Sequence, residues 1–193
     1  MERTLVIERS TLGIRLGAVA LGAVLVALAA QVAVPLPGTP VPMTLQPMAV
    51  LLVGGLLGAR LGALSMILYL TMGAAGLPVF TPTVPLFGIA RLLGPTGGYL
   101  LAYPVAAWAV GALLTTGRRP GVNLPDWSRV TVGVLLGLIL IHVGGLAQLA
   151  ILTGNLSAAA RLATWPFLLG DVLKLVILVP VLTRLTPTIR ARL

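Results

Sequence analysis

Apolar residues occupy long stretches of the chain, and proline, glycine or arginine interrupts these stretches at a few places. Residues 16–59 contain no charged side chain, and this stretch is too long for one membrane crossing of about 20 residues. The segment PLPGTPVP, residues 35–42, divides it, because clustered prolines cannot continue a helix. Along the whole chain this pattern predicts six transmembrane helices, near residues 12–34, 45–59, 61–76, 97–116, 130–153 and 166–186.

The connections between these helices differ in composition. The segment 76–98 is rich in proline and glycine yet apolar, so we expect a long loop without helix. The segment 117–129, GRRPGVNLPDWSR, is predicted to be a polar turn, and 154–165 leads into the last helix. We therefore expect residues 1–193 to form a single integral-membrane domain.

The composition favours a membrane location, since 58% of the residues are hydrophobic and only 9% are charged. Soluble domains carry about 25% charged residues, and so few charges cannot cover a surface that is exposed to water. The first apolar run, 16–34, is also longer than the apolar core of a signal peptide, which has about 7–15 residues. The sequence thus predicts an all-α, polytopic membrane protein that keeps its first helix.

The basic residues predict which side of the membrane each loop faces. Six crossings place both termini on one side, together with Arg3, Arg9, Arg15, Arg60, Arg118, Arg119, Arg129, Arg184, Arg190 and Arg192. Only Arg91 and Arg161 lie opposite, and Lys174 lies inside the last helix. Because cytoplasmic loops carry an excess of Lys and Arg, both termini are predicted to be cytoplasmic, in the plasma membrane of a prokaryote. The net charge of +9 comes from single residues at the ends of apolar runs, which argues against nucleic-acid binding.

An acidic residue and the only lysine of the chain lie three positions apart in the last predicted helix, within WPFLLGDVLKLVILVPVL. Asp171 and Lys174 share one helix face, and an ionised group at this depth costs about 2.5–3.5 kcal/mol. Arg91 lies in a loop on the same outer side, where the charge rule disfavours it. Two interpretations stay open: an ion pair that holds the last helix to a neighbour, or a binding site for a polar, anionic small molecule.

Other polar residues are candidates for the same site. Tyr99 in LGPTGGY offers a ring and a hydroxyl, and Gln46 offers an amide. Thr44 is either the N-cap of the second helix or a ligand contact. His142 is either a proton carrier or a hydrogen bond between helices. With no cysteine and a single histidine, we expect neither a metal site nor the catalytic set of an enzyme.

The first predicted helix carries pairs of small residues spaced by four: Gly13 and Gly17, Ala18 and Gly22, and Ala23 and Ala27. This spacing lets another helix approach closely. The approaching helix belongs either to the same bundle or to a separate subunit.

The segments AQVAVPLPGTPVPMTLQ, LLGARLGALSMILYLTMGAAGLPVF, LLGPTGGYL and PFLLGDVLK follow one another along the chain. Together they resemble the BioY family, the biotin-specific substrate-binding (S) components of energy-coupling factor (ECF) transporters. The resemblance implies a six-helix bundle with a biotin pocket near the outer face, covered by the loop between the first two helices. It also implies that Ala23 and Ala27 contact a transmembrane coupling subunit, which works with two ATPases.

By this resemblance, Asp171 accepts hydrogen bonds from the ureido N–H groups of biotin. Arg91 and Lys174 bind the carboxylate or the carbonyl of biotin, in a division that stays open. Further expected binding residues are Tyr99, Gln46, Thr44 and Phe80. The resemblance implies a transporter component and not an enzyme, with biotin as the transported ligand and no cofactor. The alternative is a self-sufficient transporter of biotin or a related small carboxylate, either oligomeric or coupled to protons.

Overall fold

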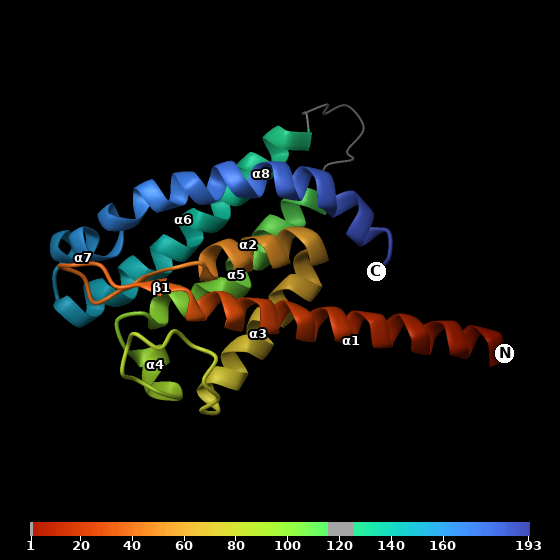
Figure 1. Ribbon diagram of the computed structural model, residues 1–193, viewed down its shortest axis with the longest axis horizontal. Helices are drawn as coiled ribbons and strands as arrows, with labels where there is room; N and C mark the ends of the chain where they lie inside the picture. The colour runs from red at the N-terminus through yellow and green to blue at the C-terminus, as the bar shows by residue number, and fades with distance from the viewer. Residues whose placement is uncertain (1, 116–125) are drawn as a thin grey trace.

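The computed structural model describes the backbone of residues 2–115 and 126–193, and helices form most of it (Figure 1). The predicted turn residues Arg118 and Arg119 lie outside the described residues. All six predicted long helices are present: α1 (Glu2–Gln31), α2 (Gln46–Leu57), α3 (Ala59–Ala74), α5 (Gly97–Thr115), α6 (Asp126–Thr153) and α8 (Leu168–Arg190). The predicted helical bundle is therefore confirmed.

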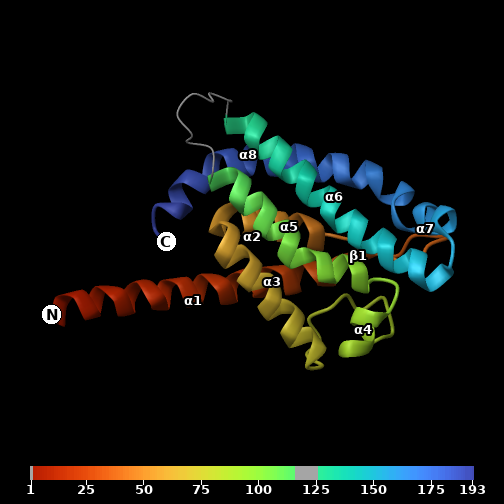
Figure 2. The same cartoon turned by 180° about the vertical axis from the view of Figure 1, so that it is seen from behind.

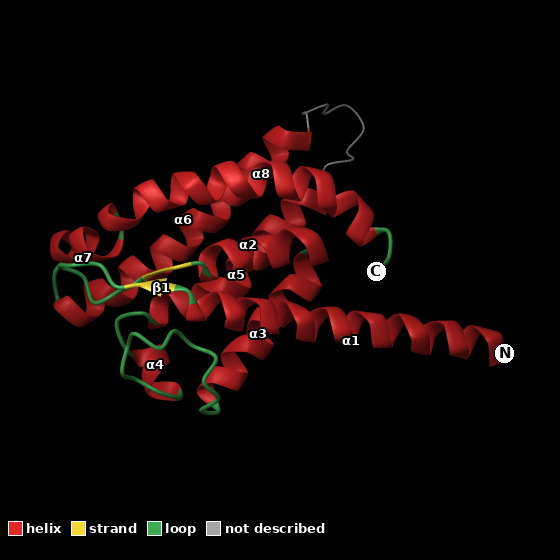
Figure 3. Ribbon diagram, viewed as in Figure 1, coloured by secondary structure: helices red, strands yellow, loops and turns green. Residues whose placement is uncertain are grey.

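The structure adds short elements that the sequence pattern does not predict (Figure 3). These are the strands β1 (Ala33–Val34) and β2 (Met43–Thr44), the helices α4 (Ile89–Leu93) and α7 (Leu156–Ala163), and the 3-10 turn η1 (Trp165–Phe167). The strands pair antiparallel, so the proline-rich segment between them forms the end of a hairpin.

Helix α4 corrects the prediction that residues 76–98 contain no helix, and α7 lies in the segment 154–165, which was predicted only to lead into the last helix. Helix α4 follows Gly88, whose φ of 58° is readily adopted only by glycine. Helix α7 follows Asn155, whose side-chain oxygen accepts a 3.0 Å hydrogen bond from the backbone N–H of Ala158. Such a cap satisfies an N–H group that has no partner within the helix.

Helix α5 lies at the centre of the bundle and packs against α2, α3 and α6. Glycine permits close approach here, because a Cβ atom on Gly54 of α2 would lie only 2.7 Å from the Cα atom of Ala107 in α5. Helix α8 packs against α2 and α6, and α1 packs against α2 and α3. Buried side chains of all these helices form one apolar cluster, which fixes the positions of the helices around α5.

The outer surface of the bundle is also apolar, which is expected for a protein surrounded by lipid. Large side chains such as Ile151 and Leu169 are 81% and 84% exposed. Among the described residues, four helical stretches are long and apolar enough to cross a membrane: Leu12–Gln31, Gly97–Leu114, Trp127–Thr153 and Leu156–Arg190. Helices α2 and α3 are apolar but shorter. Together these helices make the chain a multi-pass membrane protein.

The two ends of the bundle carry different elements (Figures 1 and 2). Both chain termini lie at one end, where the N-terminal half of α1 projects past the other helices. The β1–β2 hairpin, α4 and α7 gather at the opposite end. The polar groups of interest lie at this second end.

Candidate functional site

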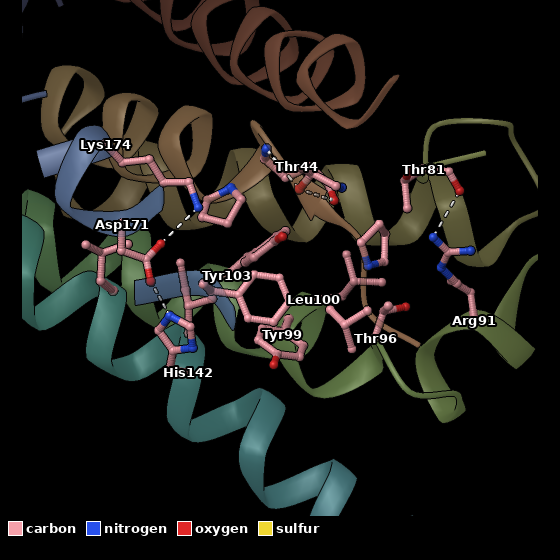
Figure 4. Close-up of a pocket in the computed structure, with 17 residues that line it drawn as sticks. Thr44, Thr81, Arg91, Thr96, Tyr99, Leu100, Tyr103, His142, Asp171 and Lys174 are labelled. Carbon is pink, nitrogen blue, oxygen red and sulfur yellow. Dashed lines mark hydrogen bonds and ion pairs between the residues drawn. The ribbon is translucent and has the colours of Figure 1, made fainter. Parts of the chain in front are cut away.

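A cavity of about 560 Å³, including the space at its mouth, lies among these elements. Its walls come from the β1–β2 hairpin, α2, the connection between α3 and α5, and from α5, α6, η1 and α8. Figure 4 shows that charged residues lie toward both ends of the cavity, with tyrosine rings between them.

One end of the cavity holds a hydrogen-bonded cluster on α8 and α6. Oδ1 of Asp171 accepts a 2.9 Å hydrogen bond from Nζ of Lys174, one turn further along α8. Oδ2 of Asp171 lies 2.5 Å from Nε2 of His142 on α6. The interpretation of His142 as a hydrogen bond between helices is therefore confirmed. Since the Asp171–Lys174 pair lies within one helix, His142 is the residue of the three that joins α8 to its neighbour.

Arg91 lies toward the other end and is only 1% exposed. Its Nη1 donates to the carbonyl of Val84 at 2.6 Å, and its Nη2 donates to the carbonyl of Thr81 at 3.0 Å. These bonds hold the loop before α4 against the cavity. Burial lowers the pKa of the guanidinium below its ordinary value, but arginine stays protonated in proteins. The Arg91 end of the cavity therefore carries a permanent positive charge.

Two donors at this end are free to bind a ligand. Nε of Arg91 and Oγ1 of Thr96 are buried and have no hydrogen-bond partner among the described residues. Both residues line the cavity, and Asp171 is the only acidic residue among the described residues that line it. An unpaired buried polar group costs about 1–3 kcal/mol, more when it is charged, so a ligand that accepts these two bonds would recover this energy.

Polar side chains between the two ends shape the middle of the cavity. The hydroxyl of Tyr99 donates a 2.5 Å hydrogen bond to the carbonyl of Ala163 at the end of α7. Gln46 donates from Nε2 to the hydroxyl of Tyr69 at 2.5 Å. The Thr44 hydroxyl accepts a 3.3 Å bond from the backbone N–H of Gln46 at the start of α2, and Thr44 also lines the cavity. Leu45 is the N-cap of α2 and no side chain caps this helix, so the interpretation of Thr44 as the N-cap is wrong. A contact between Thr44 and a ligand stays a prediction.

Comparison with known proteins decides the family. The model of the BioY family matches residues 7–191. The chain belongs to the BioY family. A probable biotin transporter BioY of Pyrococcus horikoshii is 38% identical over 81% of this chain and 86% of its own length. The biotin transporter BioY2 of Lactococcus lactis is 34% identical over 82% of each chain. These names denote transport and not catalysis, as the resemblance implied.

A solved structure supports the same assignment. The crystal structure of an S-component for biotin from an ECF-type ABC transporter superimposes with a TM-score of 0.80 and 27% identity. The match covers 91% of this chain and 92% of that chain. The similarity therefore extends over nearly the whole BioY bundle.

Six of the seven predicted binding residues line the cavity of this BioY-family chain: Asp171, Lys174, Arg91, Tyr99, Gln46 and Thr44. The seventh, Phe80, is not among the described residues that line the cavity, and its contact with a ligand stays a prediction. Phe80 is buried and packs edge-on against the ring of Tyr69, with the ring centroids 5.4 Å apart. It supports Tyr69, which in turn holds Gln46.

The structure also brings in residues that the sequence did not single out. Thr81, Thr96 and Tyr103 line the cavity. Thr81 and Thr96 lie in the loops on either side of α4, and Tyr103 follows Tyr99 by one turn of α5. The spacing between the two tyrosines was the available signal, because residues four apart share a helix face.

The predicted docking pair on α1 does not lie together on the outer surface. Ala23 is fully buried within the chain itself, whereas Ala27 is half-buried. The prediction that Ala23 faces a partner is therefore corrected, because α2 and α3 pack against this part of α1. By contrast, Gly13 and Gly17 are exposed and have open space around them.

Proposed function

We propose that this BioY-family chain captures biotin at the outer face of the plasma membrane of a prokaryote, as the substrate-specific component of an ECF-type transporter. The observation that carries the proposal is the separation of two kinds of group within one cavity. An acidic residue, Asp171, lies toward one end, and a buried cation, Arg91, which has no acidic partner among the described residues, lies toward the other. Biotin has the complementary shape, with two ureido N–H donors at one end and a carboxylate at the other.

The free donors support one orientation of biotin. The carboxylate takes the Arg91 end, where Nε of Arg91 and the hydroxyl of Thr96 have no other partner. Arginine–carboxylate contacts are charge-assisted hydrogen bonds, which are roughly twice as strong as neutral ones. The ureido ring takes the other end, where Asp171 accepts N–H bonds and Lys174 donates to the ureido carbonyl. Tyr99 and Tyr103 lie between the two ends and pack along the aliphatic part of the ligand.

The energy for release into the cell comes from other subunits in this proposal. A transmembrane coupling subunit docks on the exposed part of α1, which includes Gly13 and Gly17, and two ATPases act through that subunit. Both termini lie in the cytoplasm, as the arginine distribution predicts. The hairpin end of the bundle then faces outward, where biotin arrives.

Analysis of the bound ligand tests this function directly. The protein is purified from its membrane and denatured, and the released small molecules are identified by mass spectrometry. About one biotin per chain is expected, with saturable rebinding by calorimetry. Release of a different small carboxylate, with no binding of added biotin, would contradict the proposal. Biotin uptake into vesicles that lack ATPases would instead favour the self-sufficient transporter.

A further inference from the structure

The imidazole of His142 lies between two hydrogen-bond acceptors. Nε2 is 2.5 Å from Oδ2 of Asp171 on α8, and Nδ1 is 3.3 Å from the carbonyl oxygen of Ala163 at the end of α7. The Ala163 oxygen is an acceptor by its chemistry and also accepts the hydroxyl of Tyr99. Asp171 accepts a charge-assisted bond from Lys174 on its other oxygen, which favours the ionised carboxylate. Neither neighbour of the imidazole therefore supplies a proton.

The number of N–H donors that this arrangement requires indicates the protonation state of the His142 imidazole. A neutral imidazole has one N–H group and can donate to only one of the two acceptors, whereas an imidazolium donates to both. The neutral form would leave a ring nitrogen facing an oxygen with no hydrogen between them, in a half-buried position. We propose that His142 carries two N–H protons in the folded protein, so that the His142–Asp171 pair is a proton-binding site in the wall of the cavity.

Among the groups around His142, the carboxylate of Asp171 compensates the positive charge of the protonated imidazole. Helix α5 presents Tyr99, whose ring centroid lies 6.2 Å from that of His142. The 3-10 turn η1 presents the apolar ring of Phe167, also at 6.2 Å. On α7, Arg161 is exposed and does not face the site. Among the described residues that face the imidazole, Asp171 is thus the only carboxylate.

A second hollow reaches His142 from the outer side of the bundle, between α6 and α8. It shares Leu138, His142 and Asp171 with the cavity, so these three side chains form the partition between the two spaces. Apart from His142 and Asp171, Thr164 is the only polar residue among the described residues that line the hollow. The part of the hollow that the structure describes brings no other titratable group to the pair from the lipid side.

The proton adds to the positive charge that a ligand meets, and this step rests on the proposed function. Protonated His142 and Lys174 outnumber Asp171 at one end of the cavity, and Arg91 adds a further charge toward the other. An anionic ligand is attracted by this excess, so the proton and the ligand each favour binding of the other. Loss of the second proton from His142 should therefore weaken ligand binding.

Nuclear magnetic resonance tests the proton site without any ligand. His142 is the only histidine of the chain, so a protein labelled with 15N-histidine and purified through a histidine-free tag gives the signals of this residue alone. At neutral pH the two ring nitrogens should both show the shifts of N–H groups. In Asp171→Asn, the amide can donate to Nε2, so the ring should become neutral with its proton on Nδ1. A neutral ring in the wild type, in either tautomer, would overturn the assignment.

The pH dependence of biotin binding tests the link to the ligand. Wild-type affinity should fall about tenfold over the pH range in which the nitrogen resonances report loss of the second proton from His142, which corresponds to loss of one charge-assisted interaction. In His142→Gln, which keeps a side-chain donor but does not titrate, the affinity should not change over this range. A flat wild-type profile, or the same slope in His142→Gln, would overturn the coupling. A complete lack of biotin binding would overturn the proposed function while the resonance experiment still decides the proton site.

Discussion

The hydroxyl of Tyr99 donates a buried 2.5 Å hydrogen bond to the carbonyl oxygen of Ala163, a residue 64 positions further along the chain. This bond joins the first turn of α5 to the last residue of α7. The same carbonyl lies 3.3 Å from Nδ1 of His142, so α5, α6 and α7 meet at one oxygen atom. Because Tyr99 and His142 both line the cavity, the position of α7 is tied to the shape of the binding site.

Removing this hydroxyl should loosen α7. Tyr99→Phe loses one buried hydrogen bond, which contributes about 0.5–1.5 kcal/mol to the free energy of unfolding. The carbonyl of Ala163 also loses its hydroxyl donor on α5. We expect a lower melting temperature in detergent and an affinity for biotin that is about twofold to tenfold weaker. Trp165→Phe is the matched control, since Trp165 is 68% exposed and should change neither quantity. An unchanged melting temperature in Tyr99→Phe would contradict this role.

Asp171→Asn separates ligand binding from a purely structural ion pair. The substitution keeps the shape of the side chain but adds N–H groups that face the ureido N–H groups of biotin. Loss of a charge-assisted hydrogen bond should cost about 1.5–3 kcal/mol, or roughly ten- to a hundredfold in affinity. The affinity for biotin is measured by calorimetry and the melting temperature by thermal unfolding, on the same sample. Wild-type affinity combined with a lower melting temperature would mean that Asp171 only holds α8 in place.

Biotin methyl ester tests which cation meets the carboxylate. The wild-type protein should bind the ester at least tenfold more weakly than biotin, since the ester cannot accept a charge-assisted bond from the Arg91 end. In Arg91→Lys the charge is kept but the Nε donor is lost, and in Thr96→Val only the hydroxyl is lost. In both variants, the difference in affinity between biotin and its methyl ester should be smaller than in the wild type. If the carboxylate of biotin lies at the Lys174 end instead, Lys174→Met should reduce this difference in affinity, and the Arg91 and Thr96 variants should not.

The two parts of α1 should respond differently to a bulky side chain. Gly17→Trp adds a ring in open space, so biotin binding and thermal stability should be kept. The same variant should fail to co-purify with the coupling subunit and fail to support ATP-dependent uptake in vesicles. Ala23→Trp should instead lower the melting temperature, because overpacking a buried site costs about 1–3 kcal/mol or more. Normal transport by Gly17→Trp would show that the partner docks elsewhere.

Cysteine labelling tests the orientation in the membrane, and the absence of native cysteines leaves no background. Gly38→Cys and Thr83→Cys lie at exposed positions near the cavity and should react with an impermeant maleimide added to intact cells. Arg192→Cys, exposed at the opposite end of the bundle, should react only after lysis. Labelling of Arg192→Cys from outside would reverse the orientation that the arginine distribution predicts.

The sequence determined the six long helices, because apolar segments of this length can satisfy their backbone hydrogen bonds in a membrane only as helices. It also determined that Asp171 and Lys174 share a face, because their spacing of three places them one turn apart. The proline-rich breaks between helices were equally visible, since proline cannot continue a helix. The hydrogen bonds within the β1–β2 hairpin and the cap of α7 were less visible, because short elements give weak patterns.

Tertiary packing decided which face of each helix points into the bundle. In a soluble protein the polar face of a helix marks the outside, but these helices are apolar on all sides, so the sequence does not show which residues face inward. For this reason the sequence did not show that Ala23 packs inside the bundle rather than on a partner. Phe80 lies in the connection after α3, and only the folded structure shows that its ring packs against Tyr69. His142 on α6 and Asp171 on α8 pair only when the packing of the two helices sets the rotation of each about its own axis. The partners of Arg91 are carbonyls of the loop before α4, so the fold of that loop decides them.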